Sequence, residues 1–184
     1  MPSSLPDFHA PAPVLARALV GWNLLVDGAG GVVVETEAYT REDPASHSFA
    51  GETRRNAAMF GPPGRAYVYR SYGMHWCFNV VCGPAGSGQA VLLRALEPTA
   101  GLGLMQERRR LHDPRLLCAG PGRLCQALGI TAALDGADLS GPPFAWTPGK
   151  PPAVAAGPRI GISKAADRPW RFCASGSRFL SRKA

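Results

Sequence analysis

Two acidic residues and a tyrosine alternate along one short stretch of the chain, residues 32–39, which reads Val-Val-Val-Glu-Thr-Glu-Ala-Tyr. In a strand, successive side chains point to opposite faces. One face is then small and apolar, and its members are Val32, Val34, Thr36 and Ala38. The other face consists of Val33, Glu35, Glu37 and Tyr39. Two carboxylates on one face are a candidate acid–base pair, although a half-solvated edge strand gives the same pattern.

The spacing of two residues places Glu35 and Glu37 about 6.6 Å apart along a strand, nominally within reach of the carboxylate pair of an inverting glycoside hydrolase. Both carboxylates nevertheless leave one strand in one direction, so they cannot easily flank a bond from opposite sides. A hydrolase of free sugars is therefore the first alternative interpretation, and this geometry disfavours it.

Three further residues, all later in the sequence, add to the chemistry that the acidic stretch offers. His47 lies in a polar segment, residues 41–55, and Arg94 interrupts an almost continuously apolar strand. An arginine in such a strand is rarely buried without a partner, so it either pairs or reaches water from the strand end. Tyr72 precedes Gly73 at the expected tip of a hairpin, where an aromatic ring gains nothing from core burial. A binding role and a fold-back of Tyr72 onto its own hairpin both remain open.

The charge balance favours a polyanionic partner. The chain has 184 residues, enough for one domain with a real core, and a net charge of +7 from 20 basic and 13 acidic residues. Lysine occurs only at positions 150, 164 and 183, so arginine supplies 17 of the basic residues. Arginine forks match phosphate geometry, and a basic surface suits nucleic acid. A non-catalytic nucleic-acid-binding module explains this balance and Tyr72, but gives no reason for Glu37 to share a face with Tyr39.

The cysteines and the chain start indicate an intracellular protein. The five cysteines are odd in number and include no Cys-x-x-Cys pair, which disfavours zinc ribbons and disulfide scaffolds. Most lie among apolar neighbours and are expected to be small core residues. The first residues lack the basic and apolar regions of a secretory signal, and no apolar stretch is long enough to span a bilayer.

Periodicity and turn residues predict the elements that must position these side chains. Residues 1–10 are expected to form a loose tail, and residues 131–152 are expected to be mostly loop. His47 is expected to lie on a short helical turn that starts at Asp43-Pro44. The predicted helices are Val14–Val20, Thr99–Leu111 and Gly120–Gly129. The predicted strands are Trp22–Val26, Val32–Tyr39, Arg65–Ser71, His75–Cys82, Gln89–Leu96, Arg159–Ile162 and Trp170–Ala174. The first two strands and the next two each form a hairpin.

An ordered series of short motifs makes the sequence specific. In chain order they are Glu35-Thr-Glu-Ala-Tyr39, His47-Ser48, Arg55-Asn56, Met59-Phe60, Tyr67-Val-Tyr69, Tyr72-Gly-Met74, Cys77-Phe-Asn79, Val91-Leu-Leu-Arg-Ala-Leu-Glu-Pro98, Gly120-Pro-Gly-Arg-Leu-Cys-Gln-Ala-Leu-Gly129 and Pro158-Arg-Ile-Gly-Ile162. This series resembles the alkyladenine (3-methyladenine) DNA glycosylase family from about residue 11 to the C-terminus. No single motif is decisive, but the ordered set is hard to reach by chance.

The resemblance implies an α+β fold: a single domain with a curved, mostly antiparallel sheet, flanking helices and a hairpin that enters the DNA minor groove. It implies a monomeric, monofunctional enzyme without lyase activity. Its partner would be double-stranded DNA that contains damaged purines such as 3-methyladenine, 7-methylguanine, hypoxanthine or ethenoadenine. No metal, no organic cofactor and no membrane is expected.

The resemblance also assigns roles to residues. Glu37 matches the general base, and Arg94 matches the residue that orients the water and the carboxylate. Tyr39 on one side and His47 with Tyr69 on the other match the walls that stack on the flipped base. Asn79 matches a residue that excludes guanine through its exocyclic amine, and Leu92 lies near the same wall. Tyr72, with Met74 beside it, matches the wedge that fills the gap in the duplex.

Other positions carry no assignment. The resemblance gives Glu35 no chemical role and does not identify an acid for neutral leaving bases. It also leaves open Arg54, the loop between Tyr39 and His47, and the loop over residues 83–88.

Overall fold

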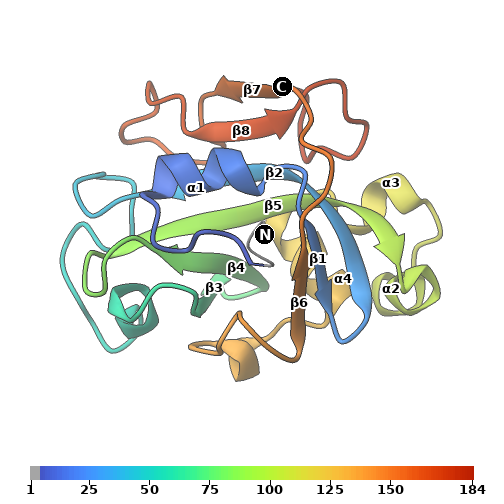
Figure 1. Cartoon of the computed structure of the whole chain (residues 1–184), viewed down its shortest axis with the longest axis horizontal. Coiled ribbons are helices and arrows are strands. Elements are labelled where there is room, and N and C mark those ends of the chain that lie inside the picture. The colour runs from blue at the N-terminus through green and yellow to red at the C-terminus, as the bar shows by residue number, and fades with distance from the viewer. Residues whose placement is uncertain (1–4) are drawn as a thin grey trace.

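The computed structural model, which describes residues 5–184, contains one curved antiparallel sheet of eight strands (Figure 1). The strand order is β3-β4-β5-β2-β1-β6, and β7 and β8 join through pairing of β8 with β2. The strands are β1 (Asn23–Val26), β2 (Ala29–Tyr39), β3 (Ala66–Ser71), β4 (His75–Cys82), β5 (Gln89–Ala100), β6 (Phe144–Thr147), β7 (Val154–Gly157) and β8 (Arg171–Ala174). The α+β class and the single domain predicted from the sequence are confirmed for this part of the chain.

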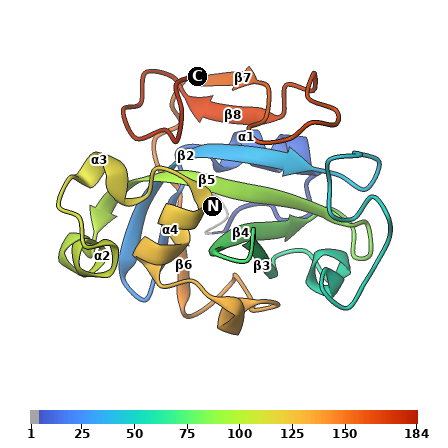
Figure 2. The ribbon, with the colours of Figure 1, turned by 180° about the vertical axis from the view of Figure 1, so that it is seen from behind.

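Helices pack on both sides of the sheet. Figure 1 shows α1 in front of β2 and β5, and Figure 2, seen from behind, shows α4 in front of the sheet. The helices are α1 (Ala12–Leu19), α2 (Leu102–Arg109), α3 (Pro114–Leu117) and α4 (Pro121–Leu128), with short 3-10 turns η1 (Ala57–Phe60) and η2 (Ala132–Leu134). The buried residues of α1 recur at helical spacing, as an amphipathic helix requires; they are Ala12, Leu15, Ala16 and Leu19. No helix among the described residues is long and apolar enough to cross a membrane.

Two tight turns make the hairpins that the sequence predicted. Asp27 and Gly28, between β1 and β2, both have positive φ (49° and 80°), as a two-residue turn of this twist requires. Tyr72 and Gly73, between β3 and β4, also have positive φ (50° and 66°). Glycine adopts this conformation freely, whereas a bulky residue such as tyrosine rarely does.

The pairing of β2 with β5 contains irregularities that alter the predicted faces. The register passes from Val33↔Leu96 to Glu35↔Ala95 and then to Thr36↔Leu93. Val34 is therefore an extra residue on β2, and Arg94 is an extra residue on β5. Because of the first bulge, Val33 packs in the core with Val34 and not on the face of the acids, so that assignment was wrong. Ala38 packs in the core as predicted, and the hydroxyl of Thr36 on the same face donates to the carbonyl of Ala16 on α1. Val32 is only half-buried and is not part of the core.

Other boundaries also differ from the prediction. Residues 1–4 lie outside the described residues, but the rest of the predicted loose tail packs on the domain: Phe8 is buried and its ring contacts Trp146 edge-on.

The predicted strand Arg159–Ile162 is wrong; the strand is β7, and residues 159–162 form an irregular segment after it. The predicted loop over residues 131–152 contains β6, which pairs with β1. No helix forms at His47, which lies in consecutive hydrogen-bonded turns: Ser46 donates to the carbonyl of Asp43 and Phe49 donates to the carbonyl of Ser46. The five cysteines are buried and free.

Candidate active site

A row of directly opposed residues crosses five strands and forms the base of the candidate site. The pairs in this row are Tyr67↔Asn79, Asn79↔Leu92, Leu92↔Glu37 and Glu37↔Arg171, from β3 through β4, β5 and β2 to β8. Opposed residues in a sheet point to the same face. The sheet therefore brings together side chains that are up to 134 residues apart in the sequence, as between Glu37 and Arg171.

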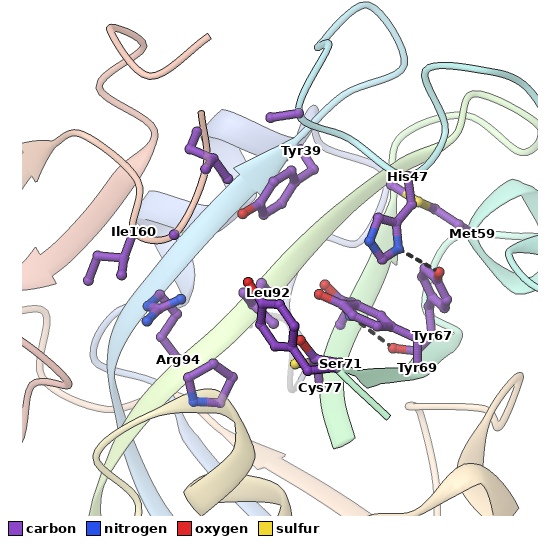
Figure 3. Close-up of a pocket in the computed structure, with 16 residues that line it drawn as sticks. Tyr39, His47, Met59, Tyr67, Tyr69, Ser71, Cys77, Leu92, Arg94 and Ile160 are labelled. Carbon is purple, nitrogen blue, oxygen red and sulfur yellow. Dashed lines mark hydrogen bonds between the residues drawn. The ribbon is translucent and has the colours of Figure 1, made fainter. Parts of the chain in front are cut away.

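A cavity of about 430 Å³ opens on this face (Figure 3). Its lining includes seven of the nine residues predicted for the site: Tyr39, His47, Tyr69, Tyr72, Asn79, Leu92 and Arg94. The remaining lining residues are Ala45, Met59, Tyr67, Ser71, Cys77, Pro121, Ile160, Gly161 and Ile162. The other two predicted residues, Glu37 and Met74, do not line it. Glu37 lies just behind the lining, and Met74 is exposed at the hairpin tip.

Three aromatic rings form one side of the cavity. Figure 3 shows His47, Tyr67 and Tyr69 together, opposite Tyr39. The ring centroids of His47 and Tyr69 are 4.3 Å apart, and those of Tyr67 and Tyr69 are 5.4 Å apart. The hydroxyl of Tyr67 and Nδ1 of His47 are hydrogen-bonded at 2.9 Å, which fixes the orientation of the imidazole ring. Burial, and next the charge of Arg55, lower the pKa of His47, so the neutral ring is favoured.

Tyr39 forms the opposite side and is held from behind. Its hydroxyl donates a hydrogen bond of 2.7 Å to Oε2 of Glu37. Burial and the charge of Glu37 raise the pKa of Tyr39, so the hydroxyl keeps its proton as a donor. The guanidinium of Arg159 lies over the Tyr39 ring, with Cζ 4.7 Å from the centroid, and forms a two-point ion pair with buried Asp43.

Glu37 is completely buried and has three partners. Besides accepting from Tyr39, it accepts a hydrogen bond of 2.7 Å at Oε1 from the backbone N–H of Ile160, and Nη1 of Arg94 lies 3.5 Å from Oε1. A carboxylate offers about four lone-pair sites, so these contacts leave one site of Glu37 free to accept from a water, although no solvent reaches the side chain in this structure. All three partners line the cavity. The carboxylate is therefore fixed in place directly behind the cavity wall.

Glu35, two residues earlier, is an equally buried carboxylate in a different setting. Arg94 donates from Nε to its Oε1 at 3.2 Å, and Arg171 donates from Nε to the same oxygen at 2.8 Å. The backbone N–H and the hydroxyl of Ser181 also donate to Glu35, at 2.6 Å and 2.8 Å. Arg94 thus lies between the two carboxylates and contacts both.

The buried charges of the described residues all belong to this region. They are three carboxylates, Glu35, Glu37 and Asp43, and three guanidiniums, Arg94, Arg159 and Arg171. Burying an unpaired charge is very costly, and here the formal charges cancel. Stability alone does not require such a cluster, because apolar residues would fill the same volume at least as well. Its concentration beside one cavity is typical of a functional site.

The hairpin tip contrasts with this buried cluster. Tyr72 is 89% exposed and Met74 is 68% exposed. Tyr72 nevertheless contributes to the rim of the cavity. Arg70, close by on β3, lies over the ring of Trp76 at 5.4 Å and adds positive charge near the tip.

Comparison with known families now bears on this geometry. Residues 6–178 match the family model described as Methylpurine-DNA glycosylase (MPG). The chain belongs to this family.

Relatives of similar length support the assignment. The chain is 61% identical to a Nitrosospira multiformis protein over 177 residues, which is 96% of this chain and 92% of the relative. It is 61% identical to a Rhodopseudomonas palustris protein over 170 residues (91% and 84%) and 55% identical to an Agrobacterium fabrum protein over 177 residues (96% and 90%). Each of the three carries the name "Putative 3-methyladenine DNA glycosylase". The family of DNA repair glycosylases inferred from the motif series is thus confirmed.

Sequence reasoning missed several residues of this glycosylase-family site. Asp43 and Arg159 hold Tyr39 and the segment with Ile160, whereas Asp43 was expected only to start a helical turn before His47 and Arg159 was expected only to lie in a strand. Arg159 belongs to the motif Pro158–Ile162, and residues 159–162 were predicted to form a strand. Tyr67 is part of the motif Tyr67-Val-Tyr69 but had no assigned role, and its hydroxyl is hydrogen-bonded to His47. No group of three or more His, Cys, Asp or Glu side chains within the described residues is arranged to hold a metal ion.

Proposed function

We propose that the protein hydrolyses the N-glycosylic bond of damaged purines in double-stranded DNA, after flipping the nucleotide into the cavity between Tyr39 and the rings of His47 and Tyr69. The observation that carries the proposal is the buried carboxylate of Glu37, which Tyr39, Arg94 and Ile160 hold against that cavity. A base stacked on Tyr39 would bring its sugar close to this carboxylate.

The walls suit an electron-poor purine. Flipping costs a few kcal/mol, and stacking on aromatic side chains returns roughly 1–3 kcal/mol per base. A cationic alkylated base gains more, because the faces of aromatic rings attract positive charge. The neutral state of His47 avoids a repulsive charge beside such a base. Substrates are therefore expected among 3-methyladenine, 7-methylguanine, hypoxanthine and ethenoadenine.

Two residues at the base of the cavity supply selection against normal guanine. Asn79 is nearly buried, and its Nδ2 donates to the carbonyl of Tyr67 at 3.1 Å. With its amide committed in this way, Asn79 excludes the exocyclic amine of guanine by crowding. Leu92, the neighbour of both Asn79 and Glu37 in the cross-strand row, closes the same side.

Glu37 acts as the general base in this proposal. A water on its free lone pair loses its proton to the carboxylate as the bond to the base breaks. The negative charge also stabilises the positive charge that develops on the sugar. Arg94 orients both the carboxylate and the water from its place beside Glu37.

The hairpin supplies the wedge. Tyr72 enters the gap left by the flipped nucleotide, with Met74 against the neighbouring base pair, since an inserted aromatic or apolar side chain replaces lost stacking. The protein acts without lyase chemistry in this proposal, because none of the lining residues is a lysine that could form a Schiff base. It acts as a monomer, as the sequence resemblance implies.

The test is single-turnover excision of hypoxanthine from a defined duplex by Glu37→Gln. Glutamine keeps the size but cannot accept the proton, so excision falls by about 10²–10⁴ while affinity for the same duplex stays within a few fold. Glu97→Gln on β5, outside the cavity, is the matched control and keeps the wild-type rate. Full activity of Glu37→Gln would show that the base is wrongly assigned.

Product analysis separates this proposal from a binding module and from a lyase. Free base and an intact abasic strand are expected, in the presence of a chelator as in its absence. Borohydride is expected to trap no protein–DNA adduct. Binding without release of base would favour the non-catalytic module, and a trapped adduct would show lyase chemistry.

A further inference from the structure

The segment after β8 returns to β2 and contacts the buried carboxylate of Glu35. Ser181 donates twice to this group: from its backbone N–H to Oε2 at 2.6 Å, and from its hydroxyl to Oε1 at 2.8 Å. Ser181 is 146 residues from Glu35 in the sequence, and it lies outside the residues 6–178 that match the family model. Neither the match nor the motif series therefore gives it a role.

The same hydroxyl also contacts Arg94. Nη2 of Arg94 donates to Oγ of Ser181 at 3.4 Å, while Nε of Arg94 donates to Glu35 at 3.2 Å. A hydroxyl has one donor and two acceptor sites, so Oγ can donate to Glu35 and accept from Arg94 at once. The remaining nitrogen, Nη1, faces Glu37 at 3.5 Å. Each nitrogen of the guanidinium thus has a different partner.

The backbone around Ser181 is fixed by a second arginine. Arg171 on β8 donates from Nη2 to the carbonyl of Arg182 at 2.6 Å and from Nη1 to the carbonyl of Lys183 at 3.4 Å. Its Nε binds Glu35. Residues 181–183 are therefore held to the ion-pair cluster at three successive positions, and this holds the hydroxyl of Ser181 at Arg94.

We propose that Ser181 is a positioning residue for the glycosylase reaction. It satisfies Glu35 and one end of the Arg94 guanidinium, so that Arg94 does not turn fully onto Glu35 and keeps Nη1 on Glu37. Ser181 touches neither base nor sugar and acts through Arg94. This inference rests on the proposed function, since it needs Glu37 and Arg94 to serve the chemistry.

The experiment uses Ser181→Ala in the full chain. The substitution removes the hydroxyl but keeps the backbone hydrogen bond to Glu35. Single-turnover excision of hypoxanthine is expected to fall by up to about 10²-fold, the cost of a misplaced orienting group. Affinity for the lesion duplex and the melting temperature stay near wild type, and Ser181→Thr restores the rate. Ser177→Ala is the matched control, because that hydroxyl only accepts from the N–H of Phe179, and it keeps the wild-type rate.

A double substitution tests whether the effect passes through the proposed base. In the Glu37→Gln background, Ser181→Ala is expected to cause no further loss. A wild-type rate for Ser181→Ala, a further loss in the double variant, or a rate loss matched by an equal loss of affinity for the lesion duplex would overturn the inference. If Ser181→Ala does not fold, Ser181→Cys is compared instead, since it keeps the volume and loses the strong hydrogen bonds. Failure of the proposed function itself shows separately, as full activity of Glu37→Gln.

Discussion

The two ends of the candidate site are built in opposite ways. Around Glu37, six buried charged groups hold one another, and the carboxylate itself is 0% exposed with donors on both oxygens. At the tip of the β3–β4 hairpin, Tyr72 is 89% exposed and sits in a positive-φ conformation that tyrosine rarely adopts.

This difference shows which side chains are held in place by the protein itself and which are not. The buried end is organised before DNA arrives, which is what stabilisation of developing charge requires, because groups that need not reorganise act most strongly. The exposed end gains little stability from the rest of the domain, because Tyr72 and Met74 are mostly in solvent, and this suits the wedge role proposed for it. Substitutions that break a buried ion pair should therefore act on folding, whereas substitutions at the hairpin tip should act on DNA and leave folding unchanged.

The largest effect on folding is expected from Asp43→Asn. The change leaves the buried guanidinium of Arg159 without its charged partner, and breaking a buried ion pair in this way costs about 3–5 kcal/mol. Denaturant unfolding at pH 7 measures the loss in the free energy of unfolding.

The matched control for Asp43→Asn is Asp113→Asn, which lies at the exposed start of α3. Asparagine still caps that helix, and the ion pair it loses, with Arg115, lies at the surface. A loss in Asp113→Asn as large as that in Asp43→Asn would mean that burial of the charges around Tyr39 is not what holds this end together.

A smaller effect, on DNA alone, is expected from Tyr72→Ala. Removal of the wedge loses stacking worth roughly 1–3 kcal/mol, so excision from duplex DNA falls by about 5- to 150-fold, whereas excision from single strands changes little. Unfolding should change as little as it does in Val14→Ala, an exposed apolar residue on α1. Equal losses on duplex and single-stranded substrates would speak against a wedge.

The sequence predicted the elements whose signal is local. Alternation in residues 32–39 and the apolar run with Arg94 indicated the two central strands, and Tyr72-Gly73 indicated the hairpin turn. Arg94 interrupts an apolar strand, and the expectation that a buried arginine there needs a partner holds, since it pairs with Glu35 and contacts Glu37. The motif series then supplied roles that alternation could not.

What the sequence could not predict depends on contacts between distant segments. The contacts of Glu35 could not be predicted, because its partners Arg171 and Ser181 follow 136 and 146 residues later. Arg159 was assigned to a strand, since Arg-Ile-Gly-Ile alternates like one, whereas its side chain is fixed by Asp43 and the Tyr39 ring. Val33 changed faces because a bulge at Val34 breaks the alternation, and this bulge has no glycine that could have marked it in the sequence.

The smallest expected effect concerns the protonation of His47, which lies between the two ends. Burial is the main cause that lowers its pKa, and Arg55 adds to it. In the unfolded chain a histidine titrates near 6.5, so as the pH falls below that value the unfolded state takes up a proton before the folded state does. The contribution of His47 to the free energy of unfolding is therefore constant above pH 6.5. As the pH drops from 6.5 to the pKa of the folded state, the free energy of unfolding decreases.

NMR titration of the His47 ring should give a midpoint below 6.5. Arg55→Met should move the midpoint only part of the way back, because burial remains, and Arg54→Met is the control that should not move it. A midpoint at or above 6.5 would contradict a neutral His47 wall beside a cationic base.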